Sequence, residues 1–347
     1  MINFSQKLLK WYKINQRNLP WRDVDDPYKI WLSEIILQQT RVQQGMPYYE
    51  KFILTFPTVY DLAKASEDEI LKLWEGLGYY SRARNMHFTA KYIVEELHGK
   101  FPNNYADLLK LKGVGNYTAA AIASFAFKEA VAAVDGNVYR VLARIFGIKD
   151  DIMSNQAKKI FQSLANELIP KNQPDIFNQA MMDLGSMVCK PKQPLCETCF
   201  MQEECFAFRH DEIVNLPVKS KKIKVKKRFF HFLLLENADK NIVIEQRSDN
   251  DIWKNLYQFP LIETNLEASE DVIQSEFEKK FNKQKLTDFQ ELIGYYTKHQ
   301  LTHQQLHIRF YKSKIDYSEK TISLIDIPKY AFPVPIKKFL KKYYSQS

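Results

Sequence analysis

Leu111-Lys112-Gly113-Val114-Gly115 places two glycines around one small apolar residue, and helical sequence flanks this stretch on both sides. Such a pair of glycines makes a tight hairpin whose backbone can approach another backbone closely. We expect the following helix to begin near Asn116, where its free N–H groups would point outward and could bind one phosphate. An ordinary glycine turn has the same pattern, so the interpretation depends on the rest of the chain.

The sequence around this hairpin is typical of helices. Residues 118–127 are rich in alanine, whose small side chain lets neighbouring helices approach closely. Ser66-Glu67-Asp68-Glu69 has the pattern of a capping box ahead of an apolar run. Nine of the ten glycines lie at or before Gly185, so the two halves of the chain differ in composition. The first half is therefore predicted to be mainly helical.

The second half reads differently. Residues 219–228 hold seven basic residues in ten, which favours an exposed linker. Residues 229–235, 242–245 and 306–311 are rich in strand-forming side chains, and an acidic, helix-like stretch covers 270–281. This mixture predicts a small α+β domain from about residue 228 to residue 347.

Composition narrows the classes of protein. The 347 residues allow about two domains, and 45% hydrophobic with 26% charged residues is the balance of a folded globular protein. No run of 18 apolar residues occurs and the N-terminus has no signal-peptide pattern, so we expect neither a membrane span nor secretion. Lys and Arg exceed Asp and Glu by 50 − 41 = 9. A polyanionic partner is thus plausible, with nucleic acid ahead of membrane.

The four cysteines of the chain form one cluster, Cys189-x6-Cys196-x2-Cys199-x5-Cys205. Clustered cysteines in a chain without an export signal indicate metal ligands before disulfides. Zinc usually takes two C-x2-C pairs, and only one is present here. The compact, irregular spacing favours an iron–sulfur cluster, with zinc and free thiols as the alternatives. Lys190 and Lys192 suggest that this loop also faces an anion, although they could equally be solvated charges.

Two carboxylates have unusual surroundings. Glu34 lies on a predicted helix with Ile30, Trp31 and Leu37 on its own side, so its pKa should be raised and the acid could donate a proton near neutrality. Asp135 ends an apolar stretch and precedes a predicted helix whose N–H groups should keep it ionised. One neutral and one charged carboxyl is the pair that cleavage of a glycosidic bond needs. The alternatives are a surface charge for Glu34 and a simple N-cap for Asp135.

These features together resemble one family. The order of hairpin, Val134-Asp135-Gly136-Asn137-Val138 and four cysteines is similar to that of the endonuclease III superfamily of helix-hairpin-helix DNA glycosylases. The chain looks like its adenine DNA glycosylase branch (MutY) over roughly residues 5 to 210, and it resembles that branch's Nudix-like domain later on. The stretches that carry this likeness are residues 31–34, 37–42, 76–82, 178–185, 246–247 and 252–260.

The resemblance implies a domain organisation. A mainly α glycosylase domain would occupy 1–188, with the helix-hairpin-helix element near 107–127. An iron–sulfur loop holding one [4Fe-4S] cluster would follow at 189–205, and a basic linker at 206–228. An α+β Nudix-like lesion-recognition domain would occupy 229–347. No Glu-rich catalytic box follows a glycine there, so pyrophosphatase activity is not expected.

The resemblance also implies catalytic roles. The acid at Glu34 would protonate adenine on a ring nitrogen, and the acid at Asp135 would meet the oxocarbenium-like sugar, supported by Tyr117 and Asn137. Relatives that also cut the DNA strand carry a lysine where this chain has Tyr117. Without that amine no Schiff base can form at this position, so we expect a monofunctional glycosylase.

Further residues match DNA-contacting positions of the family. Gln39 and Tyr79 would wedge into the base stack, and Thr302 would hydrogen-bond the lesion. The family usually has Phe-Ser-His where this chain has Leu301-Thr302-His303, so an aromatic wedge is lost. Trp21 and Tyr79 could also be ordinary core aromatics. The other matched positions are Trp21, Arg22, Leu37 and Gln179 around the flipped adenine, and Gly113 and Gly115 in the hairpin.

The resulting expectation is a cytoplasmic, monomeric bacterial enzyme that acts near the nucleoid and not at a membrane. It would excise adenine opposite 8-oxoguanine or guanine in double-stranded DNA during base excision repair. One alternative is a glycosylase for thymine opposite guanine, since a tyrosine at the Tyr117 position also occurs there. The other alternative is a non-catalytic DNA-binding module.

Overall fold

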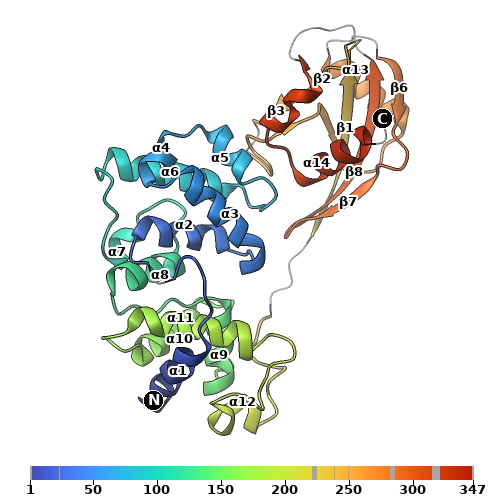
Figure 1. Ribbon diagram of the computed structural model, residues 1–347. Coiled ribbons are helices and arrows are strands. Elements are labelled where there is room, and N and C mark those ends of the chain that lie inside the picture. The colour runs from blue at the N-terminus through green and yellow to red at the C-terminus, as the bar shows by residue number, and fades with distance from the viewer. Residues whose placement is uncertain are drawn as a thin grey trace. The chain divides into compact units, whose positions relative to one another are not determined.

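The computed structural model describes residues 2–22, 24–220, 225–237, 239–248, 250–281, 286–314 and 321–345. The chain forms two compact units (Figure 1). The first, here called the helical unit, comprises Met1–Lys64 and Arg84–Lys221. The second, here called the sheet unit, comprises Ala65–Ala83 and Lys222–Ser347. No helix among the described residues is both long and apolar enough to cross a membrane.

Helix caps set the boundaries in the helical unit. Asp26 caps α2 through the Tyr28 N–H, and Pro27 takes the first helical position, where no N–H is needed. Ser154 caps α10 in the same manner. The helices are α1 (Ile2–Asn15), α2 (Pro27–Leu37), α3 (Val42–Thr55), α4 (Val59–Lys64), α6 (Ser81–Glu95, which begins in the sheet unit), α7 (Tyr105–Leu108), α8 (Asn116–Phe127), α9 (Gly136–Phe146), α10 (Asn155–Leu168), α11 (Pro174–Asp183) and α12 (Phe206–Arg209), with a π-helix at Leu184–Val188 and a 3₁₀-helix at Gln202–Glu204.

A fully buried core holds α1, α9, α10 and α11 together. Leu8, Val141, Phe161 and Phe177 from these four helices belong to one cluster and are at most 1% exposed. Burial of a large apolar side chain contributes about 1.5–3 kcal/mol, so these contacts stabilise the unit more than any single cap. The core holds α9 and α11 in place, and both helices carry predicted site residues.

The glycine hairpin has the predicted geometry. Gly113 adopts a φ of +82°, and a Cβ there would lie 2.9 Å from the Asn85 Cβ. Gly115 is the N-cap of α8, which begins at Asn116 as expected. The Thr89 hydroxyl donates to the Lys112 carbonyl at 2.8 Å and ties the hairpin to α6. The N–H groups of the first turn of α8 are therefore presented on a rigid turn.

The sheet unit is the predicted α+β domain. Its main sheet has the strand order β6-β8-β1-β2-β9, with β5 also paired to β1 and β7 to β8. The long central strands β1 and β8 run parallel, and their other pairings in this sheet are antiparallel. The elements are α5 (Glu67–Leu73), β1 (Lys226–Glu236), β2 (Ile242–Val243), β3 (Glu245–Gln246), β4 (Tyr257–Gln258), β5 (Leu261–Thr264), α13 (Glu270–Lys280), β6 (Thr287–Glu291), β7 (Thr297–Gln300), β8 (Gln304–Lys314), β9 (Thr321–Ile322), a 3₁₀-helix (Leu324–Lys329) and α14 (Val334–Tyr344).

The segment Ala65–Ala83 packs with the C-terminal residues although it lies far from them in the sequence. The capping box predicted at Ser66 is present at the start of α5. Asp68 accepts a hydrogen bond from the Tyr257 hydroxyl at 3.1 Å. The Glu75 side chain is 6% exposed, forms an ion pair with Lys337 and accepts from the Phe332 N–H at 3.0 Å. The sheet unit thus includes part of the first half of the chain, which the composition did not indicate.

Candidate active site

A cavity of about 630 Å³ lies in the helical unit. Its wall comes from the stretch before α2, from α2 and the turn into α3, from α8, from the start of α9, and from α11 with the residues that follow it. Nine residues singled out in the sequence line this one cavity: Trp21, Arg22, Glu34, Leu37, Gln39, Tyr117, Asp135, Asn137 and Gln179.

Glu34 is a buried acid. Helix α2 is buried along most of its length, and Glu34 is only 6% exposed beside fully buried Trp31. Burial raises the pKa of Glu34 to about 7, and the charge of Asp135 adds to the rise. A hydrogen bond with Tyr117 and the charge of Arg22 oppose it. Glu34 is therefore no surface charge, and its carboxyl group can hold a proton near neutrality.

Asp135 is the N-cap of α9, as its sequence context predicted. Its Oδ1 accepts from the N–H groups of Asn137 at 2.8 Å and Val138 at 2.9 Å, and its Oδ2 accepts from Asn137 Nδ2 at 2.7 Å. Burial raises the pKa of Asp135, and these hydrogen bonds and the charge of Arg140 oppose the rise. The sequence predicted that the N–H groups of the helix favour the charged form of Asp135, and the capping hydrogen bonds act in that direction. Burial acts in the opposite direction and is the larger of the two effects.

Tyr117 and Arg140 organise the two acids. The Tyr117 hydroxyl hydrogen-bonds Glu34 and lies 3.5 Å from the Met182 sulfur, and burial raises its pKa well above the ordinary value. Arg140 donates to Asn137 Oδ1 at 2.8 Å and to the carbonyl of Gly185 at 2.7 Å. Asn137, which itself holds Asp135, is thereby fixed to the residues after α11.

No pattern in the sequence indicated the ion-pair cluster that lies behind the cavity. Asp183 is fully buried and accepts from Arg22 through both of its oxygens, at 2.6 and 2.8 Å. Arg17 donates to the same carboxylate through Nε at 2.6 Å. Both arginines line the cavity, and the charge of Arg22 acts on Glu34. The partners are more than 160 residues apart in the sequence, so no local pattern could have joined them.

The predicted DNA-contacting residues lie in three places: the cavity, the glycine hairpin and the sheet unit. In the cavity wall, the ring of Trp21 packs edge-on against that of Tyr49, with the ring centroids 5.2 Å apart. Trp21 is 9% exposed, so it is a core aromatic as well as a cavity residue. Gly113 and Gly115 lie in the hairpin. Tyr79 and Thr302 belong to the sheet unit, where their hydroxyl oxygens are 2.6 Å apart.

Tyr79 is exposed and held in an unusual backbone conformation. Its φ is +48° and its side chain is 47% exposed. The Arg82 guanidinium lies over the ring of Tyr79 at 5.6 Å and over that of Trp74 at 5.0 Å. Tyr79 is thus exposed on one side and packed against Arg82 on the other, which suits contact with another molecule better than a place in the core.

The four cysteines line one small pocket in the helical unit. Cys189, Cys196, Cys199 and Cys205 all line it and all carry free thiols. Burial raises the pKa of Cys196, of Cys205 and, to about 11, of Cys199. Arg144 points at this pocket and donates to the Cys189 sulfur at 3.5 Å and to the Lys190 carbonyl at 2.8 Å.

Four thiols that line one pocket are the ligand set that a [4Fe-4S] cluster takes, since such a cluster is bound by four thiolates. Among the described residues, no group of three or more His, Cys, Asp or Glu side chains is arranged to hold a metal ion. Arg144 would offset part of the negative charge of the thiolates. Lys192 is exposed beside this loop, and Lys190 is half-buried.

Family comparisons agree with this geometry. A family described as "HhH-GPD superfamily base excision DNA repair protein" matches residues 32–170, and the NUDIX domain matches residues 231–342. The first match spans the hairpin and both acids. A glycine hairpin, two acids in one cavity and a four-cysteine loop on this scaffold define a helix-hairpin-helix DNA glycosylase with an appended Nudix-like domain.

Individual relatives narrow the class. The chain is 35% identical to the adenine DNA glycosylase of Buchnera aphidicola subsp. Schizaphis graminum over 344 residues, 97% of this chain and 98% of that protein. It is 45% identical to the Homo sapiens adenine DNA glycosylase over 213 residues, 59% of this chain and 39% of that protein. The chain belongs to the adenine DNA glycosylase family, enzymes of base excision repair that hydrolyse N-glycosyl bonds.

Solved structures match the helical part. A thermostable thymine-DNA glycosylase superposes with a TM-score of 0.55 at 31% identity, over 60% of this chain and 96% of that chain. An endonuclease III–DNA complex superposes with a TM-score of 0.53 at 21% identity, over 60% of this chain and 95% of that chain. The second likeness shows the fold alone.

Proposed function

We propose that the protein removes adenine mispaired with 8-oxoguanine or guanine by a monofunctional hydrolysis, with Glu34 as general acid. The observation that carries this proposal is one cavity with a buried carboxyl whose pKa is about 7 and a second, capped carboxyl. A neutral carboxyl can protonate a ring nitrogen of adenine, which makes the base a better leaving group. The bond between the sugar C1′ and adenine N9 then breaks, and its electron pair leaves with the base.

Asp135 stabilises the positive sugar that remains. It accepts three hydrogen bonds that favour its charged form, whereas Glu34 has one such bond, with Tyr117. The proton therefore resides on Glu34 and the negative charge on Asp135. The carboxylate faces the oxocarbenium-like centre until water adds to C1′ and leaves an abasic site.

The reaction stops at the abasic site. The cavity-lining residues that the structure describes include no lysine, and Tyr117 offers a hydroxyl whose pKa is far above neutrality. Formation of a Schiff base, through which a glycosylase cuts the strand, needs an amine. The enzyme therefore releases adenine and leaves the DNA backbone intact.

Separate parts of the chain bind the rest of the substrate. The hairpin at Gly113 and Gly115 offers backbone N–H groups to one phosphate, and Gln39 and Tyr79 fill the stack that the flipped adenine leaves. Thr302 reads the opposite base, with its hydroxyl directed by that of Tyr79. The cysteine loop holds a [4Fe-4S] cluster, which has a structural role and no redox step in the hydrolysis.

The test is base release from three duplexes, carrying A opposite 8-oxoguanine, A opposite G, and T opposite G. Alkali treatment then reveals each abasic product. We expect release from the first two duplexes only, and no strand cleavage before alkali. Asp135→Asn keeps the cap but removes the charge, so it should stop release while the protein stays folded. Release of thymine, or strand cleavage without alkali, would contradict the proposal.

A further inference from the structure

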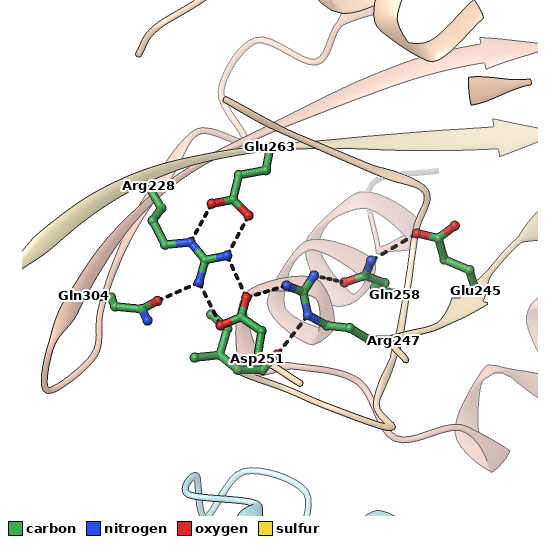
Figure 2. Close-up of polar contacts among 8 residues, drawn as sticks. Arg228, Glu245, Arg247, Asp251, Gln258, Glu263 and Gln304 are labelled. Atoms are coloured by element: carbon green, nitrogen blue, oxygen red, sulfur yellow. Dashed lines mark hydrogen bonds and ion pairs between the residues drawn. The ribbon is translucent and has the colours of Figure 1, made fainter. Parts of the chain in front are cut away.

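Every N–H group of the Arg228 guanidinium is hydrogen-bonded (Figure 2). Its guanidinium donates twice to Glu263 at 2.6 Å, twice to Asp251 at 3.0 and 2.6 Å, and once to Gln304 Oε1 at 2.9 Å. These five bonds use all five N–H groups of an arginine. The side chain is 9% exposed and lies over the Phe230 ring at 4.8 Å. Lysine could not reproduce this arrangement, since it lacks the planar fork.

A second arginine restrains the carboxylate that Arg228 holds. Arg247 donates to Asp251 at 2.8 Å, to the Ile252 carbonyl at 2.8 Å and to Gln258 at 3.2 Å (Figure 2). Asp251 thus lies between two buried guanidinium groups, and the Arg228 side contributes most to holding its pKa down at about 2. The network links β1, the turn before β4, β5 and the start of β8 through side-chain hydrogen bonds.

One end of this network is the hairpin loop that carries Thr302. Residues 301–303 connect β7 to β8, and Gln304 is the first residue of β8. The Gln304 carbonyl accepts from the Leu301 N–H at 2.8 Å, which closes the loop at its base. On β1, the Lys226 N–H donates to the His303 carbonyl at 2.9 Å. The loop is therefore attached to β1 at two points, by the Lys226 backbone and by the Arg228 side chain through Gln304.

We propose that Arg228 is a positioning residue for discrimination of the base opposite adenine, because it fixes the Thr302 loop through Gln304. The inference rests on the proposed role of Thr302. In this role Arg228 and Gln304 act on the loop and need no contact with either base. They hold the loop in the geometry in which the Thr302 hydroxyl lies 2.6 Å from that of Tyr79, so loss of the Gln304 link widens the distribution of Thr302 positions. Discrimination between similar bases needs such fixed placement of a polar group.

The test uses the full chain and measures single-turnover excision opposite 8-oxoguanine and opposite guanine. The readout is the ratio of the two rates. Gln304→Leu removes the acceptor at similar size and should lower the ratio about fivefold, the scale of one ordinary hydrogen bond. Gln304→Glu keeps an acceptor oxygen for Arg228 and should retain the ratio within about twofold. Gln290→Leu, an exposed Gln on the neighbouring strand β6, is the matched control and should leave the ratio unchanged.

A double-mutant cycle with Thr302→Ala separates the positioning role of Arg228 and Gln304 from the proposed role of Thr302 itself. If Gln304 acts through Thr302, adding Gln304→Leu to Thr302→Ala should lower the ratio no further. An unchanged ratio in Gln304→Leu, or an equal loss opposite both bases, overturns the positioning role while a lowered ratio in Thr302→Ala preserves the reader. If Thr302→Ala itself leaves the ratio unchanged, the placement of the reader fails and the positioning role fails with it.

Discussion

At the scale of single residues, the proposed mechanism depends most on the protonation of Glu34. A general acid at this position acts only while it is protonated, and burial of the side chain raises the pKa of Glu34 to about 7. A proton is present below that pKa and lost above it. Activity should therefore depend on pH in the range where ordinary carboxylic acids no longer titrate.

Glu34→Gln should abolish base release while binding to the mismatched duplex survives, since the amide keeps the shape but cannot give a proton. The expected loss is about 10²–10⁴-fold, the usual contribution of a general acid. In the unaltered protein, the single-turnover rate should fall as the pH rises through about 7. Rates measured from pH 5.5 to 9 would check this at about half-unit steps. Glu50→Gln, at an exposed glutamate of α3, is the control. A flat profile would remove Glu34 from its role.

Asp183 should tune Glu34 from a distance. Asp183→Asn leaves Arg17 and Arg22 without their shared carboxylate, and the uncompensated positive charge favours the ionised form of Glu34. The falling limb of the pH–rate profile should move to lower pH by about one unit. Asp175→Asn is the matched control, because Asp175 lies on the same helix as Asp183 and forms an ion pair with Lys128. An unshifted limb with a lower rate throughout would mean that Asp183 only stabilises the fold.

At the scale of elements, the two hairpin glycines have different requirements. Gly113 has a positive φ and no space for a Cβ beside Asn85, whereas Gly115 has an extended backbone and open space around it. Gly113→Ala should lower the free energy of unfolding by about 1 kcal/mol or more, because a side chain is strained there. Gly115→Ala should leave the free energy of unfolding nearly unchanged.

Gly115→Ala should affect DNA binding although it hardly changes the free energy of unfolding. If the hairpin backbone approaches a phosphate, a methyl group at Gly115 weakens binding of every duplex equally, although the protein is as stable as before. Urea unfolding and duplex binding at fixed salt measure the two effects. Gly115→Ala with unaltered binding would mean that the hairpin does not face the DNA.

The cysteine loop should make the purified protein yellow-brown, with broad visible absorbance and about four iron atoms per chain. Cys196→Ser should reduce both the absorbance and the iron content, because one of the four thiolates of the pocket is lost. Iron analysis and a visible spectrum of the two proteins measure this. Colourless, active protein with one zinc ion would show that the iron–sulfur interpretation is wrong.

At the scale of the whole molecule, the proposed reaction centre and the proposed reader of the opposite base lie in different units. The cavity belongs to the helical unit, and Thr302 belongs to the sheet unit. A chain ending before β1 should therefore excise adenine, but with a much smaller preference for 8-oxoguanine over guanine. It should also be less stable, since Ala65–Ala83 loses the partners of Asp68 and Glu75. Single-turnover rates on both duplexes check the preference. An equal loss on both would make the C-terminal half a clamp for the backbone.

The sequence by itself determined the features that depend on neighbouring residues. The Gly113 turn, the start of α8, the capping box at Ser66 and the Asp135 cap all rest on backbone geometry within a few residues. The strands at 229–235 and 306–311 and the helix at 270–281 followed from local composition in the same way. Short-range sterics and hydrogen bonding act in any chain with that local sequence, so they can be read without a fold.

Only the tertiary structure decided which distant residues meet. Asp183 lies against Arg17 and Arg22, Tyr79 meets Thr302 across 223 positions, and Ala65–Ala83 packs with the C-terminal residues. It also decided the direction of the Asp135 pKa shift, because the extent of burial depends on what the fold packs around an acid. Such contacts follow from how the whole chain buries its apolar surface, and many sequence patterns are compatible with each. The chemistry of each group is local, but its strength is set by the packing of residues that are distant in sequence.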